Sequence, residues 1–186
     1  MGQSSLNAVL SLAGLDQYIQ SGVEDNLKKE FDFSGLAGIC QALEEVYGTR
    51  GGRGMALRIG RAAFARGIKN FGAMAGIRDP AFAALPLEQR TELGLKALAA
   101  IFTNFSDQAS TVSEQGDHYL FETAYSPMAW GRHADRPICH ALVGIIQESL
   151  RWASDGYEFH VQEIECRAAG QLSCVFQINK QPIGRS

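Results

Sequence analysis

Residues 137–178 read PICHALVGIIQESLRWASDGYEFHVQEIECRAAGQLSCVFQI and contain three of the four cysteines of the 186-residue chain. Together with one glutamate, these cysteines form the pattern Cys139-x23-Glu163-x2-Cys166-x7-Cys174. Soft divalent metals prefer thiolate ligands, and zinc binds four ligands in a tetrahedron in which a carboxylate oxygen can take one corner. This stretch can therefore supply a complete zinc site without help from the rest of the chain.

The local sequence explains how the cysteines could come together. Cys166 and Cys174 flank the turn-forming residues 169–171, and the runs on either side are strand-like, so a hairpin would bring the two sulfurs close. Cys139 follows a proline, and we predict that it lies in the first turn of a helix, where backbone N–H groups and the helix dipole favour a thiolate. Strict alternation places Glu163 and Cys166 on opposite faces of a strand, so the site requires a bulge or a strand end between them.

A second interpretation of the same cysteines needs no metal. Three reduced cysteines can pack in a core as small hydrophobic side chains, with Glu163 on the solvent face of its strand. A C-x7-C spacing is also a looser signal than paired C-x2-C motifs. The spacing alone leaves both interpretations open.

Three runs in this region carry a family resemblance: CHALVG at 139–144, VQEIECRAAG at 161–170 and CVFQI at 174–178. They resemble the 4-vinyl reductase domain family, also called hydrocarbon-binding, from about His118 onward. That family is known from bacteriochlorophyll-associated proteins, archaeal stand-alone proteins and the sensor domains of aromatic-responsive transcription activators. The resemblance implies a zinc ion and a homodimer, and it places the metal ligands on Cys139, Glu163, Cys166 and Cys174.

The order of the expected elements predicts an α+β fold. Helical periodicity dominates residues 1–105, with helices expected at 4–20, from Ser34 past Val46, from about 54 to 71, and at 86–105. Residues 106–180 read strand, strand, helix, strand, strand, with strands at 109–114, 118–124, 158–165 and 173–179 and a helix at 137–153. We predict one domain, 1–186, in which the N-terminal helices pack on an antiparallel sheet of about four strands and the 106–180 part binds zinc.

Two glycine features stand out in the helical part. The loop expected at 47–54 lacks the Lys-Ser/Thr pair of a P-loop, although its free N–H groups and arginines could still hold a carboxylate or phosphate. We favour close packing for its glycines and solvent or acidic partners for its arginines. Gly60, Gly67 and Gly72 give the following helix a small face, and breaks are expected at Asp79-Pro80 and Leu85-Pro86. Either a neighbouring helix or a bound ligand must lie close to that face.

Aromatic residues gather where a pocket between the helices and the sheet could form, although such a group is also typical of an ordinary core. The sensor members of the family, which bind small aromatics, favour the pocket. The candidate pocket residues are Phe102, Phe105, Tyr119, Phe121, Tyr125, Trp130 and Phe176.

Composition narrows the class of protein. A net charge of −3 gives no general attraction to nucleic acid, 46% hydrophobic residues suffice for a core, and no run is long enough to span a membrane. The opening MGQSSL is neither a secretory signal nor a myristoylation signal, so we expect a cytoplasmic protein with reduced or metal-bound thiols. Cys40 lies beside an apolar helical stripe and is expected in the core.

The leading functional hypothesis is a zinc-stabilised binding or sensor module for a small hydrophobic or aromatic ligand, without catalytic residues of its own. Four protein ligands leave zinc no open position, and no G-x-G-x-x-G dinucleotide-binding motif is present. The family resemblance leaves two alternatives. One is an enzyme or accessory factor in the vinyl reduction of bacteriochlorophyll or other tetrapyrroles, and the other is a protein-interaction scaffold, through a more distant likeness to vesicle-tethering subunits.

Overall fold

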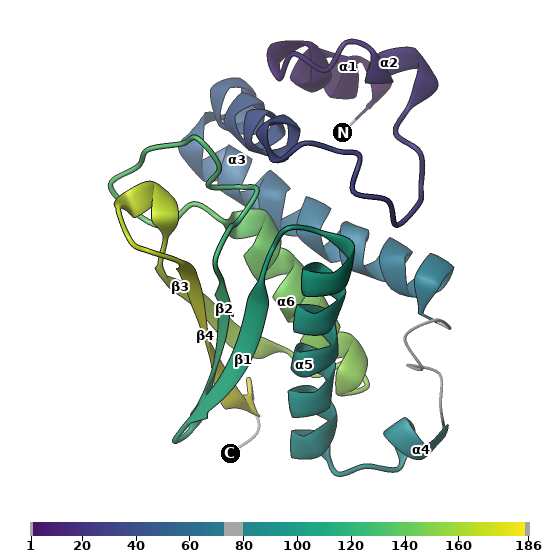
Figure 1. Ribbon diagram of the computed structural model, residues 1–186, viewed down its shortest axis with the longest axis vertical. Coiled ribbons are helices and arrows are strands. Elements are labelled where there is room, and N and C mark those ends of the chain that lie inside the picture. Colours follow the sequence, from purple (N-terminus) through teal and green to yellow (C-terminus); the bar gives the residue numbers. More distant parts are fainter. Residues whose placement is uncertain (1, 73–79, 185–186) are drawn as a thin grey trace.

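The computed structural model describes residues 2–72 and 80–184, and these form helices followed by a four-stranded sheet (Figure 1). The order of elements is α1 (Gln3–Leu12), α2 (Tyr18–Ser21), α3 (Phe33–Phe71), α4 (Pro80–Ala83), α5 (Leu87–Phe105), β1 (Ser110–Gln115), β2 (His118–Thr123), α6 (His140–Ala153), β3 (Phe159–Glu165), the short 3-10 turn η1 (Arg167–Ala169) and β4 (Cys174–Pro182).

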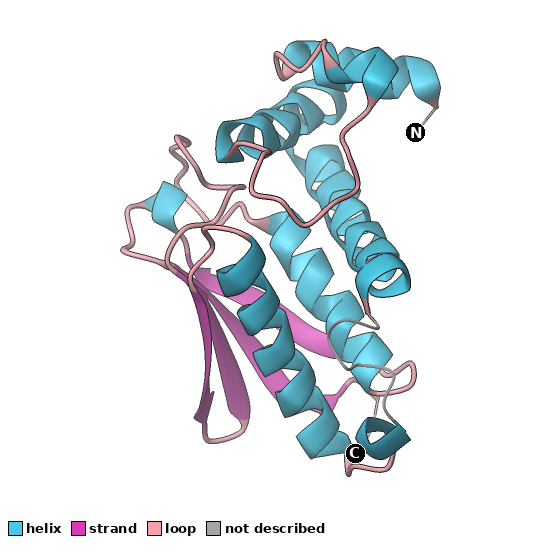
Figure 2. Ribbon diagram, turned by 45° about the vertical axis from the view of Figure 1, so that its right-hand side comes forward, coloured by secondary structure: helices cyan, strands magenta, loops and turns pink. Residues whose placement is uncertain are grey.

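The predicted α+β fold is confirmed. All neighbouring strands are antiparallel, and the sheet order is β1-β2-β4-β3, so the second hairpin strand β4 lies inside the sheet between β2 and β3. Helices α5 and α6 pack on one face of the sheet, and α3 packs on α6 (Figure 2). The core between these layers is built from fully buried side chains of the sheet and of α5 and α6, among them Tyr119, Phe121, Phe159, Phe176, Ile178, Leu95, Leu142, Ile146 and Leu150.

Helices α3 and α6 approach so closely that glycine is required on both. A Cβ atom on Gly60 would overlap the backbone oxygen of Ala141, and one on Gly144 would overlap the backbone oxygen of Leu57. The small face expected on α3 is therefore occupied by a neighbouring helix at Gly60. Gly67 differs, because a Cβ added there meets nothing within 4 Å.

The N-terminal third departs from the sequence predictions in three places. The helix expected over 4–20 ends at Leu12, because Gly14 turns the chain with a φ of 70°. The loop expected at 47–54 is instead helical on both sides of a sharp bend at Gly48, where φ is 69°. The helix expected from Ser34 begins at Phe33 and its N-cap is Asp32, whose side chain accepts a hydrogen bond from the Ser34 backbone N–H at 2.7 Å.

The remaining helices and both hairpins lie within a few residues of their predicted positions, and α6 ends at Ala153, as expected. Asp79, expected to break the chain before Pro80, lies outside the described residues. Within 2–72 and 80–184, none of the helices combines the length and the hydropathy that crossing a bilayer requires.

Candidate metal centre

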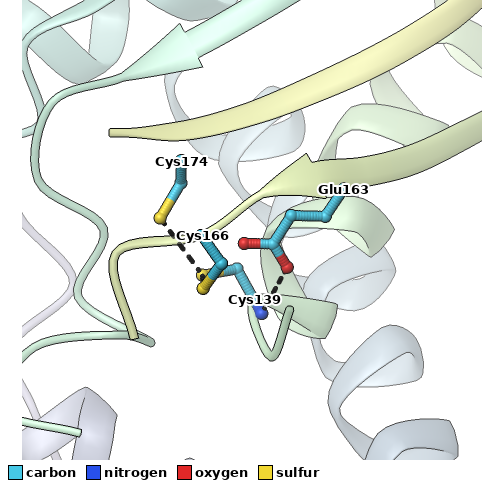
Figure 3. Close-up of side chains that lie close together, drawn as sticks. All are labelled: Cys139, Glu163, Cys166 and Cys174. Carbon is cyan, nitrogen blue, oxygen red and sulfur yellow. Dashed lines mark hydrogen bonds between the residues drawn. The ribbon is translucent and has the colours of Figure 1, made fainter. Parts of the chain in front are cut away.

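Three thiol side chains and one carboxyl side chain meet near the start of α6 and the turn that joins β3 to β4 (Figure 3). Cys139 immediately precedes α6, Glu163 lies in β3, Cys166 directly follows β3, and Cys174 opens β4. The three cysteines are completely buried and Glu163 is 7% exposed. Their nearest ligand atoms all lie within 4.8 Å of one another. The structure thus brings together the four residues singled out in the sequence.

The irregularity that the sequence required between Glu163 and Cys166 is present. Regular alternation along β3 turns Glu163 to the buried face, but the pairing register with β4 shifts between Glu163 and Glu165. Ile164 and Glu165 consequently both face solvent, and Cys166 returns to the buried side. This shift is what allows a carboxylate and a thiol three residues apart to converge.

The Cys139 prediction needs a small correction. The residue is the N-cap of α6 rather than a member of its first turn, because its ψ of 46° is not helical. At this position its backbone N–H is free of the helix, and it donates to Glu163 Oε2 at 2.8 Å. The cap geometry therefore orients the carboxylate as well as the thiol.

The sulfur spacing suits a tetrahedral metal. Cys139 Sγ lies 3.9 Å from Cys166 Sγ and 3.7 Å from Cys174 Sγ, and all three cysteines are free of disulfides. Zinc–sulfur bonds of about 2.3 Å at tetrahedral angles separate two sulfurs by about 3.8 Å. The donor set therefore fits zinc in chemistry and in scale.

Glu163 is the fourth candidate ligand. Its Oε1 is buried and accepts no hydrogen bond from any described residue. Burial, followed by the charge of Cys166, raises the pKa of this carboxyl to about 8. A buried carboxylate oxygen without a partner is costly unless a cation neutralises it.

The three thiols also shift one another's pKa values. The pKa of Cys139 lies well above its ordinary value, mainly because of hydrogen bonding with Cys166 and then with Cys174, to which burial adds. Hydrogen bonding with Cys139 and then with Cys174 lowers the pKa of Cys166. For Cys174 the hydrogen bond from Cys139 lowers the pKa, but hydrogen bonding to Cys166 and burial outweigh it and raise the pKa to about 12. Closely spaced buried thiolates repel, so a divalent cation is the natural counter-charge for this set.

Two further groups contact the sulfurs, and sequence reasoning missed both. Ser126 Oγ donates to Cys139 Sγ at 3.2 Å, and the backbone N–H of Arg167 donates to Cys174 Sγ at 3.4 Å. Such contacts fix the orientation of metal ligands. Ser126 follows β2 and lies outside the cysteine motif, so no spacing signal marked it. Cys40 lies in the core on α3, as expected, where burial raises its pKa to about 11.

The seven candidate pocket aromatics divide into separate groups. Tyr119, Phe121 and Phe176 are at most 1% exposed and belong to the core. Phe102 is half-buried and packs edge-on against Phe121 at a ring distance of 6.1 Å. The other three are at least 40% exposed and border a groove of about 540 Å³ beside residues 28–36, namely Phe105, Tyr125 and Trp130.

A separate apolar pocket of about 230 Å³ lies between α3, α5 and α6. Sequence reasoning singled out three of its residues, Gly67, Gly72 and Phe102, but for different reasons and without joining them. The others occupy apolar helical positions that look like ordinary core in a sequence. The described residues that line it are Leu27, Ala63, Phe64, Gly67, Ile68, Phe71, Gly72, Leu98, Ile101, Phe102 and Ile145.

No protein-family model matches the chain, and no curated protein sequence matches it. Among solved structures, the phenol-responsive sensory domain of the transcription activator PoxR, solved with phenol, is similar with a TM-score of 0.59 and 17% identity over 80% of this chain and 74% of that one. An Fe(II) unliganded H-NOX protein mutant from K. algicida has a TM-score of 0.57 and 14% identity over 95% of this chain and 87% of its own. These likenesses show a shared fold.

A vinyl-4-reductase family protein from Methanocaldococcus jannaschii also matches, with 23% identity over 62% of this chain and 81% of that one. Its TM-score of 0.40 is too low to support an argument. Membership of the 4-vinyl reductase family therefore stays a prediction from the sequence resemblance.

Proposed function

We propose that this chain is a zinc-stabilised binding module for a small apolar or aromatic molecule and has no catalytic activity of its own. The observation that carries the zinc part is the convergence of three buried thiols and one buried carboxyl within 4.8 Å. The resemblance to a zinc-binding family supports the same donor set independently.

Zinc would be held by the Sγ atoms of Cys139, Cys166 and Cys174 and by the carboxylate of Glu163. When bound, it supplies a compact positive charge and four directional bonds. Three of these residues belong to the β3–β4 hairpin and one to the start of α6, so the ion would fasten the helix layer to the sheet. Four protein ligands leave no coordination position for substrate, which favours a structural role.

The binding part of the proposal rests on the apolar pocket between α3, α5 and α6 and on the shared fold. Apolar pockets between helices are typical binding sites for small ligands. The PoxR domain of the same fold is described as phenol-responsive. A shared fold does not show that two proteins bind the same ligand, so the binding proposal rests on the pocket itself.

Thermal denaturation with a panel of small aromatics and tetrapyrrole precursors tests this function. A ligand that binds only the folded state raises the melting temperature with its concentration. We expect concentration-dependent shifts from apolar aromatics and no change in the compounds themselves after incubation, with or without reduced nicotinamide. Nicotinamide-dependent reduction of a vinyl group would instead establish a reductase, and a panel without any shift would favour an interaction scaffold.

A further inference from the structure

Among residues 2–72 and 80–184, no polar side chain lines the pocket between α3, α5 and α6. All eleven lining residues are leucine, isoleucine, alanine, phenylalanine or glycine. The carbonyl oxygen of Ile68 is used by the helix, since it accepts from the Gly72 N–H at 3.0 Å. The side chains would therefore hold a molecule in this pocket by shape and apolar contact alone.

We propose that this pocket is the ligand seat, that it selects uncharged hydrocarbons over hydroxylated aromatics, and that Gly67 sets its size. The inference rests on the proposed binding function and assigns it a place and a specificity. A phenolic hydroxyl that enters this lining loses its hydrogen bonds to water and gains none. The dissociation constant of toluene in water should therefore be at least roughly tenfold lower than that of phenol.

The size of the pocket indicates more than a bare ring. An apolar cavity of about 150 Å³ already binds benzene, and this pocket measures about 230 Å³. A second depression of about 360 Å³ adjoins it and shares Leu27, Phe71 and Ile101. An alkylbenzene or a fused two-ring hydrocarbon is the class that fits.

Gly67 differs from the other conspicuous glycine on the same helix. At Gly60 a side chain is excluded by the Ala141 backbone, whereas at Gly67 a Cβ would point into open space. Helix packing therefore explains Gly60 and does not explain Gly67. The missing side chain at Gly67 creates pocket volume, and a larger residue there would fill it without a backbone collision.

Gly67→Leu is the direct test, and Gly54→Leu is the matched control. Gly54 is also half-buried on α3 and has no atom within 4 Å of an added Cβ, but it does not line this pocket. Gly67→Ala provides a milder variant in case leucine disturbs folding. Binding of toluene, p-xylene, naphthalene and phenol is followed by thermal shift and by the methyl NMR signals of Leu98 and Ile101.

We expect the three hydrocarbons to raise the melting temperature of the wild type and of Gly54→Leu and to move both methyl signals. Gly67→Leu should show no such rise in melting temperature, and Gly67→Ala should weaken the binding of p-xylene more than the binding of toluene. Equal binding by Gly67→Leu and wild type, or a lower dissociation constant for phenol than for toluene, would overturn the pocket assignment while leaving the proposed function in place. If none of the four compounds binds, the pocket assignment is overturned, and the proposed function is then decided by the wider panel of aromatics and tetrapyrrole precursors.

Discussion

The Sγ atoms of Cys139 and Cys174 lie 3.7 Å apart although the two residues are 35 positions apart in the chain. Cys139 caps α6, and Cys174 opens β4, a strand in the interior of the sheet. The two sulfurs therefore mark a single point at which the helix layer and the sheet meet. Anything that binds both sulfurs couples the two layers.

Serine replacements separate metal ligands from ordinary core cysteines. Cys166→Ser and Cys174→Ser should each destabilise the protein by about 3 kcal/mol or more, because metal binding is coupled to folding. Cys40→Ser is the matched control, since Cys40 is also buried but has no second thiol nearby, and it should cost about 1–2 kcal/mol. Denaturant melts of the three variants decide this, and equal losses would identify all these cysteines as simple core residues.

Metal removal gives a second expectation. A strong chelator should lower the melting temperature of the wild type, and added zinc should restore it, because only the folded chain assembles the four ligands. Magnesium and calcium should not restore it, since both prefer oxygen ligands. The same chelator should leave the melting temperature of Cys174→Ser almost unchanged; a drop as large as in the wild type would point to metal bound elsewhere.

The ion pair between α3 and the start of β3 predicts a pH dependence. Arg61 donates to both carboxylate oxygens of Glu158, and this hydrogen bonding lowers the Glu158 pKa below its ordinary 4.5. A lowered folded-state pKa adds stability that is present above pH 4.5 and is lost as the pH falls through the folded-state value. Melting curves measured over a range of pH should show that Glu158→Gln lacks this loss of stability in acid. Glu122→Gln on the exposed sheet face should keep it.

The close approach of α3 and α6 predicts opposite effects of two similar substitutions. Gly60→Ala should cost about 2 kcal/mol or more, because its Cβ collides with backbone that cannot rotate away. Gly67→Ala should be neutral or stabilising by about 0.5–1 kcal/mol, because it replaces a helical glycine where space is open. Free energies of unfolding from urea titrations check the contrast, which equal effects of the two substitutions would contradict.

The C-terminal half could be predicted because its signals are local. Period-two alternation, Gly116 in one turn and Gly170 in the other determine the hairpins, and Gly170 has a φ of 91° that favours glycine. The requirement for an irregularity after Glu163 followed from strand geometry alone. The convergence of the four ligands followed from the hairpin, the helix start and the family resemblance.

The N-terminal third could not be predicted as well, because distant contacts decide it. Glycines and arginines at 47–54 look like a loop, but the chain is helical on both sides of the Gly48 bend, and a Cβ on Gly52 would meet the backbone of Glu44 across that bend. A local sequence pattern likewise does not show how deeply an aromatic side chain is buried, so Phe121 and Trp130 appeared equivalent in the sequence. The pocket at Gly67 requires the arrangement of three helices, which periodicity does not contain.

The zinc content of the protein, purified without added metal and measured by elemental analysis beside a thiol titration of the native fold, tests the central claim most directly. We predict close to one zinc per chain, with Cys139, Cys166 and Cys174 unreactive until the protein is unfolded or chelated. Zinc far below one per chain, in folded protein whose four cysteines all titrate freely, would contradict it.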